Sequence, residues 1–176
     1  MEAVEEILDL VDENDQIIGE VKKSEANKNP QLIHREIGVQ LYNDERKLLL
    51  QKRSYKKPIR PGVWEVTCAG HVNKGEKPLD AAHRELMEEL GFDVDLKYVE
   101  KQKQTLFNET HFTYVYLGKY DNETIKLDRE EVEEARLFGK SEVEELVNSG
   151  ATFGPNSYRF CIRFWKGEFD HLLSSF

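Results

Sequence analysis

The most informative segment of this 176-residue chain reads Gly70-His-Val-Asn-Lys-Gly-Glu-Lys-Pro-Leu-Asp-Ala-Ala-His-Arg-Glu-Leu-Met-Glu-Glu-Leu-Gly-Phe92. Pro78 is favoured in the first turn of a helix, and Gly91 is the usual residue just beyond a helix end. Between them, apolar side chains recur at helical spacing and form one stripe, made of Leu79, Ala82, Leu86 and Leu90. The segment therefore predicts a loop followed by a helix over residues 78–90.

Three carboxylates of this helix, those of Glu85, Glu88 and Glu89, span about 100° of its circumference. Like charges at this spacing repel one another and destabilise a helix. A solvated acidic face is the ordinary interpretation of such a cluster, but these acids lie beside the apolar stripe and not opposite it. Their edge then lies near the body of the protein, where a hard divalent cation, Mg²⁺ or Mn²⁺, would offset the repulsion.

The spacing of the segment is a glycine, five residues, Glu76, seven residues and then Arg-Glu-apolar-x-Glu-Glu-x-Gly-apolar. Seven fixed residues coincide by chance with a probability on the order of 10⁻⁹ per starting position. Residues 70–92 resemble the Nudix box at every defining position. The resemblance implies an α+β protein with the Nudix fold, in which mixed β-sheets are sandwiched between helices (α/β/α) in a single domain over residues 1–176.

The resemblance to Nudix hydrolases also implies residue roles. Glu85 and Glu89 would be the principal metal ligands, and Glu88 a ligand or the catalytic base that activates water. The carbonyl of Gly70 often adds a ligand in this family. Such enzymes cleave diphosphates linked to a further group X, and a metal assists by activating water and neutralising charge.

Within the box, the resemblance further implies a structural ion pair between Glu76 and Arg84, with Gly91 ending the helix. Another catalytic or metal-binding carboxylate is expected near residues 128–136. Counting back from the apolar Val132 makes Glu131 the best match, and three neighbouring acids compete with it: Glu130, Glu133 and Glu134. A weaker candidate, beside Trp64, is Glu65.

A wider resemblance covers about residues 6–140. Leu10-Val-Asp-Glu-Asn, Ile33-His-Arg and Pro61-Gly-Val-Trp are similar to the Nudix branch that includes type I isopentenyl-diphosphate isomerase. In that enzyme an Arg-x-x-x-Lys segment grips the diphosphate, and here it matches Arg53 and Lys57. Both side chains suit phosphate, Arg as a bidentate partner and Lys as a point charge.

The metal-binding histidines of the isomerase are matched only in part. His34 and His71 are in place as candidate metal ligands, whereas Asn27 stands where another histidine is expected. A hydrogen-bonded structural histidine is at least as good an interpretation of each.

The isomerase also places a catalytic cysteine immediately before the box glycine, where it exchanges a proton with the allylic carbon. Ala69 occupies that position here, and the cysteine lies one residue earlier, at Cys68. Because a one-residue shift on a strand turns a side chain to the opposite face, Cys68 is expected to be a buried structural thiol.

Three functions follow from these resemblances. We expect a Mg²⁺-dependent diphosphohydrolase that acts on a nucleoside-diphosphate-X or a related organic diphosphate. An isopentenyl-diphosphate isomerase is the alternative, and Ala69 argues against it. A non-catalytic nucleotide-binding Nudix module is the third, and the intact box argues against it.

The charge distribution agrees with a metal-bridged anionic ligand. The formal net charge of −9 disfavours binding to nucleic acid duplexes. Residues 76–89 hold five acids and two bases, and residues 121–148 hold ten acids and four bases. In contrast, residues 47–60 hold six bases and no acid. Acids placed to hold a metal and bases placed to hold an anion predict a small-molecule diphosphate partner, while solvated charge is the plainer alternative.

Composition indicates the cellular compartment in which the protein is expected. No apolar run approaches the ~18–20 residues of a membrane span, and the acidic N-terminus lacks the features of a signal peptide. Two cysteines do not form a disulfide framework, so we expect a cytoplasmic protein without membrane contacts. The oligomeric state, monomer or homodimer, stays open.

The remaining elements follow from hydrophobic periodicity. Strands are predicted for a β-hairpin over residues 7–21 and then for residues 33–43, 47–52, 63–69, 107–120 and 135–138, with strand and turn over 92–106. Ser141 is predicted to cap a helix over 142–149 with Glu144 in capping-box position, and a final helix is predicted over about 156–172. Aromatic candidates for stacking on group X, each better explained as part of the core, are Phe107, Tyr114, Tyr116 and Phe153.

Overall fold

The computed structural model describes residues 5–106 and 108–174, and these contain a seven-stranded mixed sheet. Its strands are β3 (His34–Tyr42), β4 (Leu48–Arg53), β5 (Trp64–Glu65), β6 (Cys68–His71), β7 (Leu96–Leu106), β8 (Glu109–Lys119) and β9 (Val132–Phe138). Strand order is β5-β4-β3-β8-β7, with β6 also paired to β3 and β9 to β4. The β3–β8 pair is parallel, and the other pairs of this sheet are antiparallel.

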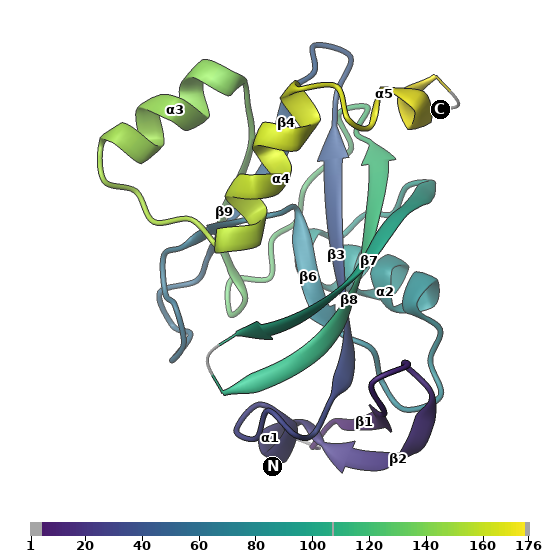
Figure 1. Ribbon diagram of the computed structural model, residues 1–176. Helices are drawn as coiled ribbons and strands as arrows, with labels where there is room; N and C mark the ends of the chain where they lie inside the picture. The colour runs from purple at the N-terminus through teal and green to yellow at the C-terminus, as the bar shows by residue number, and fades with distance from the viewer. Residues whose placement is uncertain (1–4, 107, 175–176) are drawn as a thin grey trace.

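Helices cover both faces of this sheet (Figure 1). Helix α2 (Pro78–Leu90) lies behind it and buries its apolar stripe against alternate β3 residues, Ile37, Val39 and Leu41. Helices α3 (Lys140–Asn148), α4 (Pro155–Trp165) and α5 (Asp170–Leu173) belong to the opposite side, where Phe160 and Phe164 pack against Leu48 and Leu117. The expected α+β fold, with a mixed sheet between helices, is confirmed.

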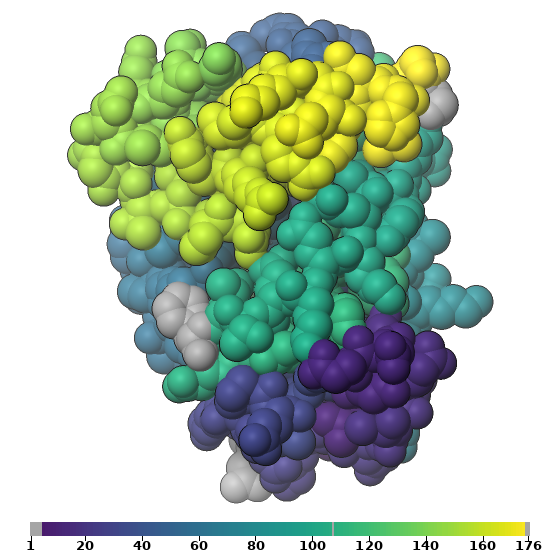
Figure 2. All heavy atoms as spheres, viewed as in Figure 1, coloured from purple at the N-terminus to yellow at the C-terminus, as the bar shows by residue number. Residues whose placement is uncertain are grey.

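The N-terminal hairpin pairs β1 (Ile7–Val11) with β2 (Ile17–Lys22) and is followed by the short helix α1 (Lys23–Ala26). The carboxylate of Asp12 accepts backbone N–H groups of Asn14 and Gln16 at 2.8 and 2.9 Å, which fixes the turn. In Figure 2 the hairpin lies at the end of the molecule opposite the C-terminal helices, which pack over β7 and β8.

Two helix boundaries differ from the sequence prediction. Helix α3 begins one residue before Ser141, and its N-cap is Gly139, whose N–H donates to the carboxylate of Glu142 at 2.7 Å. Ser141 and Glu144 therefore do not form the predicted cap, because both already lie inside the helix. The predicted C-terminal helix is two helices, since Gly167 adopts φ +81° after α4 and turns the chain.

Other boundaries differ less. The segment 63–69, predicted as one strand, is split into β5 and β6. Between them the Thr67 hydroxyl donates to the Leu49 carbonyl and accepts from the Leu41 N–H, in place of backbone hydrogen bonds of the sheet. Over the part of the chain that the structure describes, no helix is long and apolar enough to cross a membrane.

Candidate metal and diphosphate site

Gly70 lies where β6 passes directly under helix α2. A Cβ built on Gly70 would overlap the carboxyl group of Glu85, which would have to move away from β6. The absence of a side chain lets the backbone of β6 meet the acidic edge of the helix. Gly91 ends α2 with φ +78°, as the sequence predicts.

Arg84 organises the loop and the first turns of α2. Its guanidinium donates to Glu76 at 2.9 and 3.0 Å, to Glu85 at 2.7 Å, to Glu88 at 3.1 Å and to the His71 carbonyl at 2.9 Å. Burial raises the pKa of Glu76, but Arg84 and a backbone N–H outweigh it and lower that pKa. Arg84 therefore holds the loop before the helix and the acidic edge of α2 in one geometry.

Glu85 and Glu89 bring two carboxylates out of water on the same edge of α2. The Glu85 side chain is 14% exposed, and burial raises its pKa to about 7. Glu89 is buried, accepts from Gln51 Nε2 at 3.0 Å, and has its pKa raised by burial first and by the charge of Glu85 second. Arg84 offsets part of the charge of Glu85, but burial still raises the pKa of both carboxylates, so their donor set fits a divalent metal that would stabilise the charged forms.

Glu88 differs from its neighbours because its side chain is 59% exposed. It lies one turn beyond Arg84, which holds it by a single contact. Glu88 is thus free to reach solvent water beside the two buried carboxylates.

A second group of ligand atoms converges on the other face of β6. His34, Glu36, His71 and Glu109 each offer one atom, and these atoms lie within 4.8 Å of one another. The rings of His34 and His71 stack at 5.2 Å between centroids. We call these four residues the His/Glu cluster; the two histidines come from the sequence prediction and the two glutamates do not.

The hydrogen bonds of the His/Glu cluster suit a metal. His34 Nδ1 lies 3.2 Å from the Leu32 carbonyl, which places the ring proton there and leaves Nε2 as a buried lone pair without a partner among the described residues. His71 Nε2 lies 3.1 Å from Oδ1 of Asn27, the residue at the expected third histidine position. Burial lowers the pKa of His34 to about 4, which keeps its imidazole neutral and able to bind a cation.

The basic segment 47–60 lies beside both groups of acids. Lys57 Nζ pairs with Glu131 at 2.7 Å, so the predicted phosphate-binding lysine and the predicted additional carboxylate contact each other. Arg53 Nε donates to the Ile59 carbonyl at 2.9 Å. Arg60, which the sequence analysis did not single out, pairs with buried Glu65 at 2.9 Å.

Besides burial, the charge of Glu65 raises the pKa of a carboxylate in each of the two groups. Burial raises the pKa of Glu36 to about 7 and Glu65 adds to this, whereas Arg60 and Arg53 oppose it. The charges of Glu131 and Glu65 also add to the raised pKa of Glu89, after burial and Glu85. The charge of Glu65 therefore acts on one member of each group, Glu36 in the His/Glu cluster and Glu89 in the box.

Cys68 and Ala69 face opposite sides of β6, as predicted. Cys68 is fully buried in the core beneath α2, and burial raises the pKa of its thiol. Ala69 lines a cavity on the other side, together with Glu36 and Glu65. The side that carries the His/Glu cluster thus presents the methyl group of Ala69 and not the thiol of Cys68.

The predicted aromatic residues serve mainly as packing. Tyr114 and Tyr116 pack in the core beneath α2, and Phe153 packs against the core beneath α4. Phe107 lies outside the described residues.

The family model of the NUDIX domain matches residues 32–157, which spans the box, the basic segment and the His/Glu cluster. The chain belongs to the Nudix family. An isopentenyl-diphosphate Delta-isomerase 2 of Photorhabdus laumondii is 34% identical over 151 residues, covering 83% of this chain and 84% of the relative. An uncharacterized Nudix hydrolase of Listeria monocytogenes, lmo0368, is 34% identical over 143 residues, covering 81% of this chain and 85% of the relative.

Solved structures share the fold at lower identity. DR0079 of Deinococcus radiodurans superposes with a TM-score of 0.77 at 22% identity, covering 91% of this chain and 99% of that chain. The NUDIX domain of Shewanella oneidensis NrtR, solved with ADP-ribose, superposes with a TM-score of 0.63 at 11% identity, covering 83% and 92%. The relatives of this chain therefore carry the names of an isomerase and of an uncharacterized Nudix hydrolase, and the choice between the two activities rests on the residues of this chain.

Proposed function

We propose that this protein is a Mg²⁺-dependent diphosphohydrolase, with Mn²⁺ able to replace Mg²⁺. The observation that carries the proposal is the pair of desolvated carboxylates, Glu85 and Glu89, set against the side-chain-free backbone of Gly70. A divalent cation bound there would neutralise charge on the diphosphate and lower the pKa of a bound water. Such a pair without a cation would be a costly feature in a structural helix.

The reaction we propose is attack of water on one phosphorus atom of X–diphosphate. One P–O bond forms, the bridging P–O bond breaks, and the oxygen that leaves remains on the second phosphate. Glu88 is positioned to take the proton of the attacking water, because it is exposed beside the buried pair. Arg53 and Lys57 bind the phosphate oxygens, and Lys57 exchanges its Glu131 partner for the substrate.

The isomerase alternative draws support from the relatives and from the His/Glu cluster. It requires a group that exchanges a proton with an allylic carbon, and Ala69 supplies none on the side facing the cavity. We therefore infer hydrolysis and not isomerisation, which differ in their products.

A substrate panel separates these outcomes. The purified protein is incubated with MgCl₂ and ADP-ribose, a nucleoside diphosphate or isopentenyl diphosphate, and each reaction is followed by ³¹P NMR. We expect hydrolysis of at least one diphosphate with MgCl₂ and of none with EDTA. Parallel samples of isopentenyl diphosphate in D₂O are expected to show no deuterium in the carbon skeleton; its incorporation would support the isomerase instead.

We also propose that the His/Glu cluster binds a second divalent metal through the His34 Nε2 lone pair. Replacing His34 with Gln is expected to reduce the metal that copurifies with the protein, measured by elemental analysis, by about one ion per chain. His83→Gln is a matched control, because His83 lies on the far side of α2 and pairs with Asp93. Equal metal content in the His34 variant and the wild type would contradict a metal at the cluster.

A further inference from the structure

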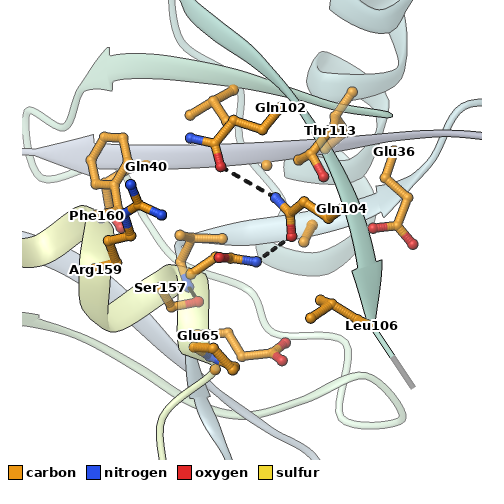
Figure 3. Close-up of a pocket in the computed structure, with 18 of the residues that line it drawn as sticks. Glu36, Gln40, Glu65, Gln102, Gln104, Leu106, Thr113, Ser157, Arg159 and Phe160 are labelled. Atoms are coloured by element: carbon orange, nitrogen blue, oxygen red, sulfur yellow. Dashed lines mark hydrogen bonds between the residues drawn. The ribbon is translucent and has the colours of Figure 1, made fainter. Parts of the chain in front are cut away.

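A cavity of about 120 Å³ opens beside the His/Glu cluster, between the sheet and the N-terminal half of α4 (Figure 3). Glu36 belongs to both the cavity wall and the cluster, and Arg60 and Glu65 also line the wall. Arg53, which the proposed function assigns to the diphosphate, acts through its charge on Glu36 in this wall, so the cavity lies near the proposed diphosphate site. Its shape and polar groups bear on the identity of group X, an inference that rests on the proposed function.

Much of the cavity wall is apolar. It includes Ile37, Val66, Ala69, Leu106, Val115 and Phe160. For comparison, an apolar cavity of about 150 Å³ holds a benzene molecule, so this one accepts a group about the size of one small ring. The apolar wall alone would suit a short hydrocarbon chain as well as the flat face of a ring, so the polar groups determine the choice.

Gln40 carries the first discriminating atom. Its Nε2 donates to the carbonyls of Leu41 and Leu49 at 2.9 and 2.8 Å and lies 3.2 Å from the Thr67 hydroxyl. Because two of these partners are carbonyls, the amide cannot be flipped, and Oε1 is fixed as an acceptor. Gln40 is fully buried, and this Oε1 has no partner among the described residues. Leaving a buried carbonyl unpaired destabilises the protein, so a donor from a ligand is favoured here.

His111 carries the second discriminating atom. Its Nε2 faces Glu36 at 3.3 Å, which favours the ring proton on Nε2 and leaves Nδ1 as an acceptor. His111 is 3% exposed, and Nδ1 is also unpartnered within the described part of the chain. Both buried, unpaired atoms on residues that line the cavity are therefore acceptors.

Neighbouring polar groups of the same cavity are satisfied. Gln102 and Gln104 on β7 and Asn156 on α4 form a ladder of amides, drawn as dashed lines in Figure 3. Since these amides use one another as partners, the unpaired atoms of Gln40 and His111 stand out as positions left for a ligand.

We propose that the cavity binds a compact group X, no larger than about one ring, that donates hydrogen bonds to Gln40 Oε1 and His111 Nδ1. Hydroxyl and N–H groups of a sugar or a heterocycle have this chemistry, and the five-carbon chain of isopentenyl diphosphate does not. A site built to bond a substrate hydroxyl rejects the analogue that lacks it, because its own polar groups are then left unpaired.

The test compares two ligands that differ by one hydroxyl group. The probes are the methylene-bridged diphosphonate analogues of dimethylallyl diphosphate and 4-hydroxy-3-methylbut-2-enyl diphosphate, which resist hydrolysis. Their dissociation constants are measured by calorimetry on the wild-type protein with MgCl₂. We expect the hydroxylated analogue to bind at least about tenfold more tightly. Equal affinity, tighter binding of the hydrocarbon analogue, or no binding of either would overturn the inference.

Variants add a second readout. Gln40→Met is expected to bring the two affinities within about twofold, while the exposed Gln31→Met keeps the wild-type ratio. If Gln40→Met does not fold, the wild-type ratio alone still decides. A hydroxyl preference without turnover of any diphosphate in the panel would contradict the proposed function and leave the cavity assignment standing. Turnover of diphosphates without the hydroxyl preference would contradict the cavity assignment and leave the proposed function standing.

Discussion

Replacing Glu89 with Gln is expected to lower kcat/KM for the best diphosphate substrate by about 10³-fold, equivalent to ~4 kcal/mol. Gln keeps the size of the side chain but removes the charge that would bind the metal. The loss is expected in steady-state kinetics at saturating MgCl₂, and Glu85→Gln should behave similarly. Glu144→Gln, an exposed change on α3 away from the site, should leave the rate unchanged.

The same variant should not be less stable than the wild type when metal is absent. Burial raises the pKa of Glu89, so its charged form is costly in the folded protein, and a neutral amide removes that cost. Thermal unfolding in EDTA should therefore give an equal or higher Tm for Glu89→Gln. Added MgCl₂ should raise the Tm of the wild type and have little effect on the variant. Full activity in both Glu85→Gln and Glu89→Gln would contradict the proposed metal site.

Asp15→Ala is expected to reduce the free energy of unfolding by about 3 kcal/mol. Asp15 is 5% exposed and accepts from Arg35 Nε at 2.6 Å, from Lys101 Nζ at 2.8 Å and from the Tyr114 hydroxyl. These contacts fasten the N-terminal hairpin to β3, β7 and β8. Removing the carboxylate leaves Arg35 and Lys101 without this partner. Breaking a buried ion pair costs ~3–5 kcal/mol of stability, and we expect the lower end of that range because the Lys101 side chain is 35% exposed.

Urea unfolding at pH 7 measures this loss, and Glu13→Ala is a matched control within the same turn. Glu13 is exposed and pairs with Lys103, so its removal should change stability by less than about 0.5 kcal/mol. Burial raises the pKa of Asp15, but Lys101, Tyr114 and Arg35 outweigh it and lower that pKa. The stabilisation is therefore present above the ordinary Asp pKa of about 3.9 and is lost as pH falls through the lowered native value. Asp15→Asn should show less acid destabilisation than the wild type, and an equal loss would contradict the network.

Sequence patterns within one segment predicted those elements whose ends and faces depend on neighbouring residues in the chain. Helix α2 has the predicted bounds, since Pro78 and Gly91 mark both ends and the apolar stripe is continuous between them. The opposite faces of Cys68 and Ala69 follow from the two-residue period of a strand. The predicted start of α3 was wrong. Serine is a frequent cap residue, which favoured Ser141, but Gly139 is the N-cap and needs only its backbone N–H to bond the Glu142 carboxylate.

The sequence predicted site residues as one group only within a single segment, while candidates elsewhere, such as His34, His71 and Lys57, came one by one from the wider resemblance. The box predicts Glu85, Glu88 and Glu89 as one group, because a single helix positions all three. The His/Glu cluster joins β3, β6 and the start of β8, so Glu36 and Glu109 cannot be paired with His34 from the sequence without the strand order. One local signal was present, since Glu36 lies two residues after His34 on β3 and shares its face. The contact between Lys57 and Glu131 is likewise a consequence of β9 pairing with β4.

Metal-dependent cleavage of a phosphorus–oxygen–phosphorus bond at the box carboxylates is the central claim. It is tested most directly by ³¹P NMR of the diphosphate panel in H₂¹⁸O with MgCl₂, for the wild type and Glu89→Gln side by side. We predict that the diphosphate signals of at least one substrate are replaced by two product signals, from two phosphomonoesters or from one phosphomonoester and inorganic phosphate, with one product shifted by ¹⁸O, in the wild type alone. No cleavage of any substrate by the wild type, or equal cleavage by Glu89→Gln or in EDTA, would contradict the claim.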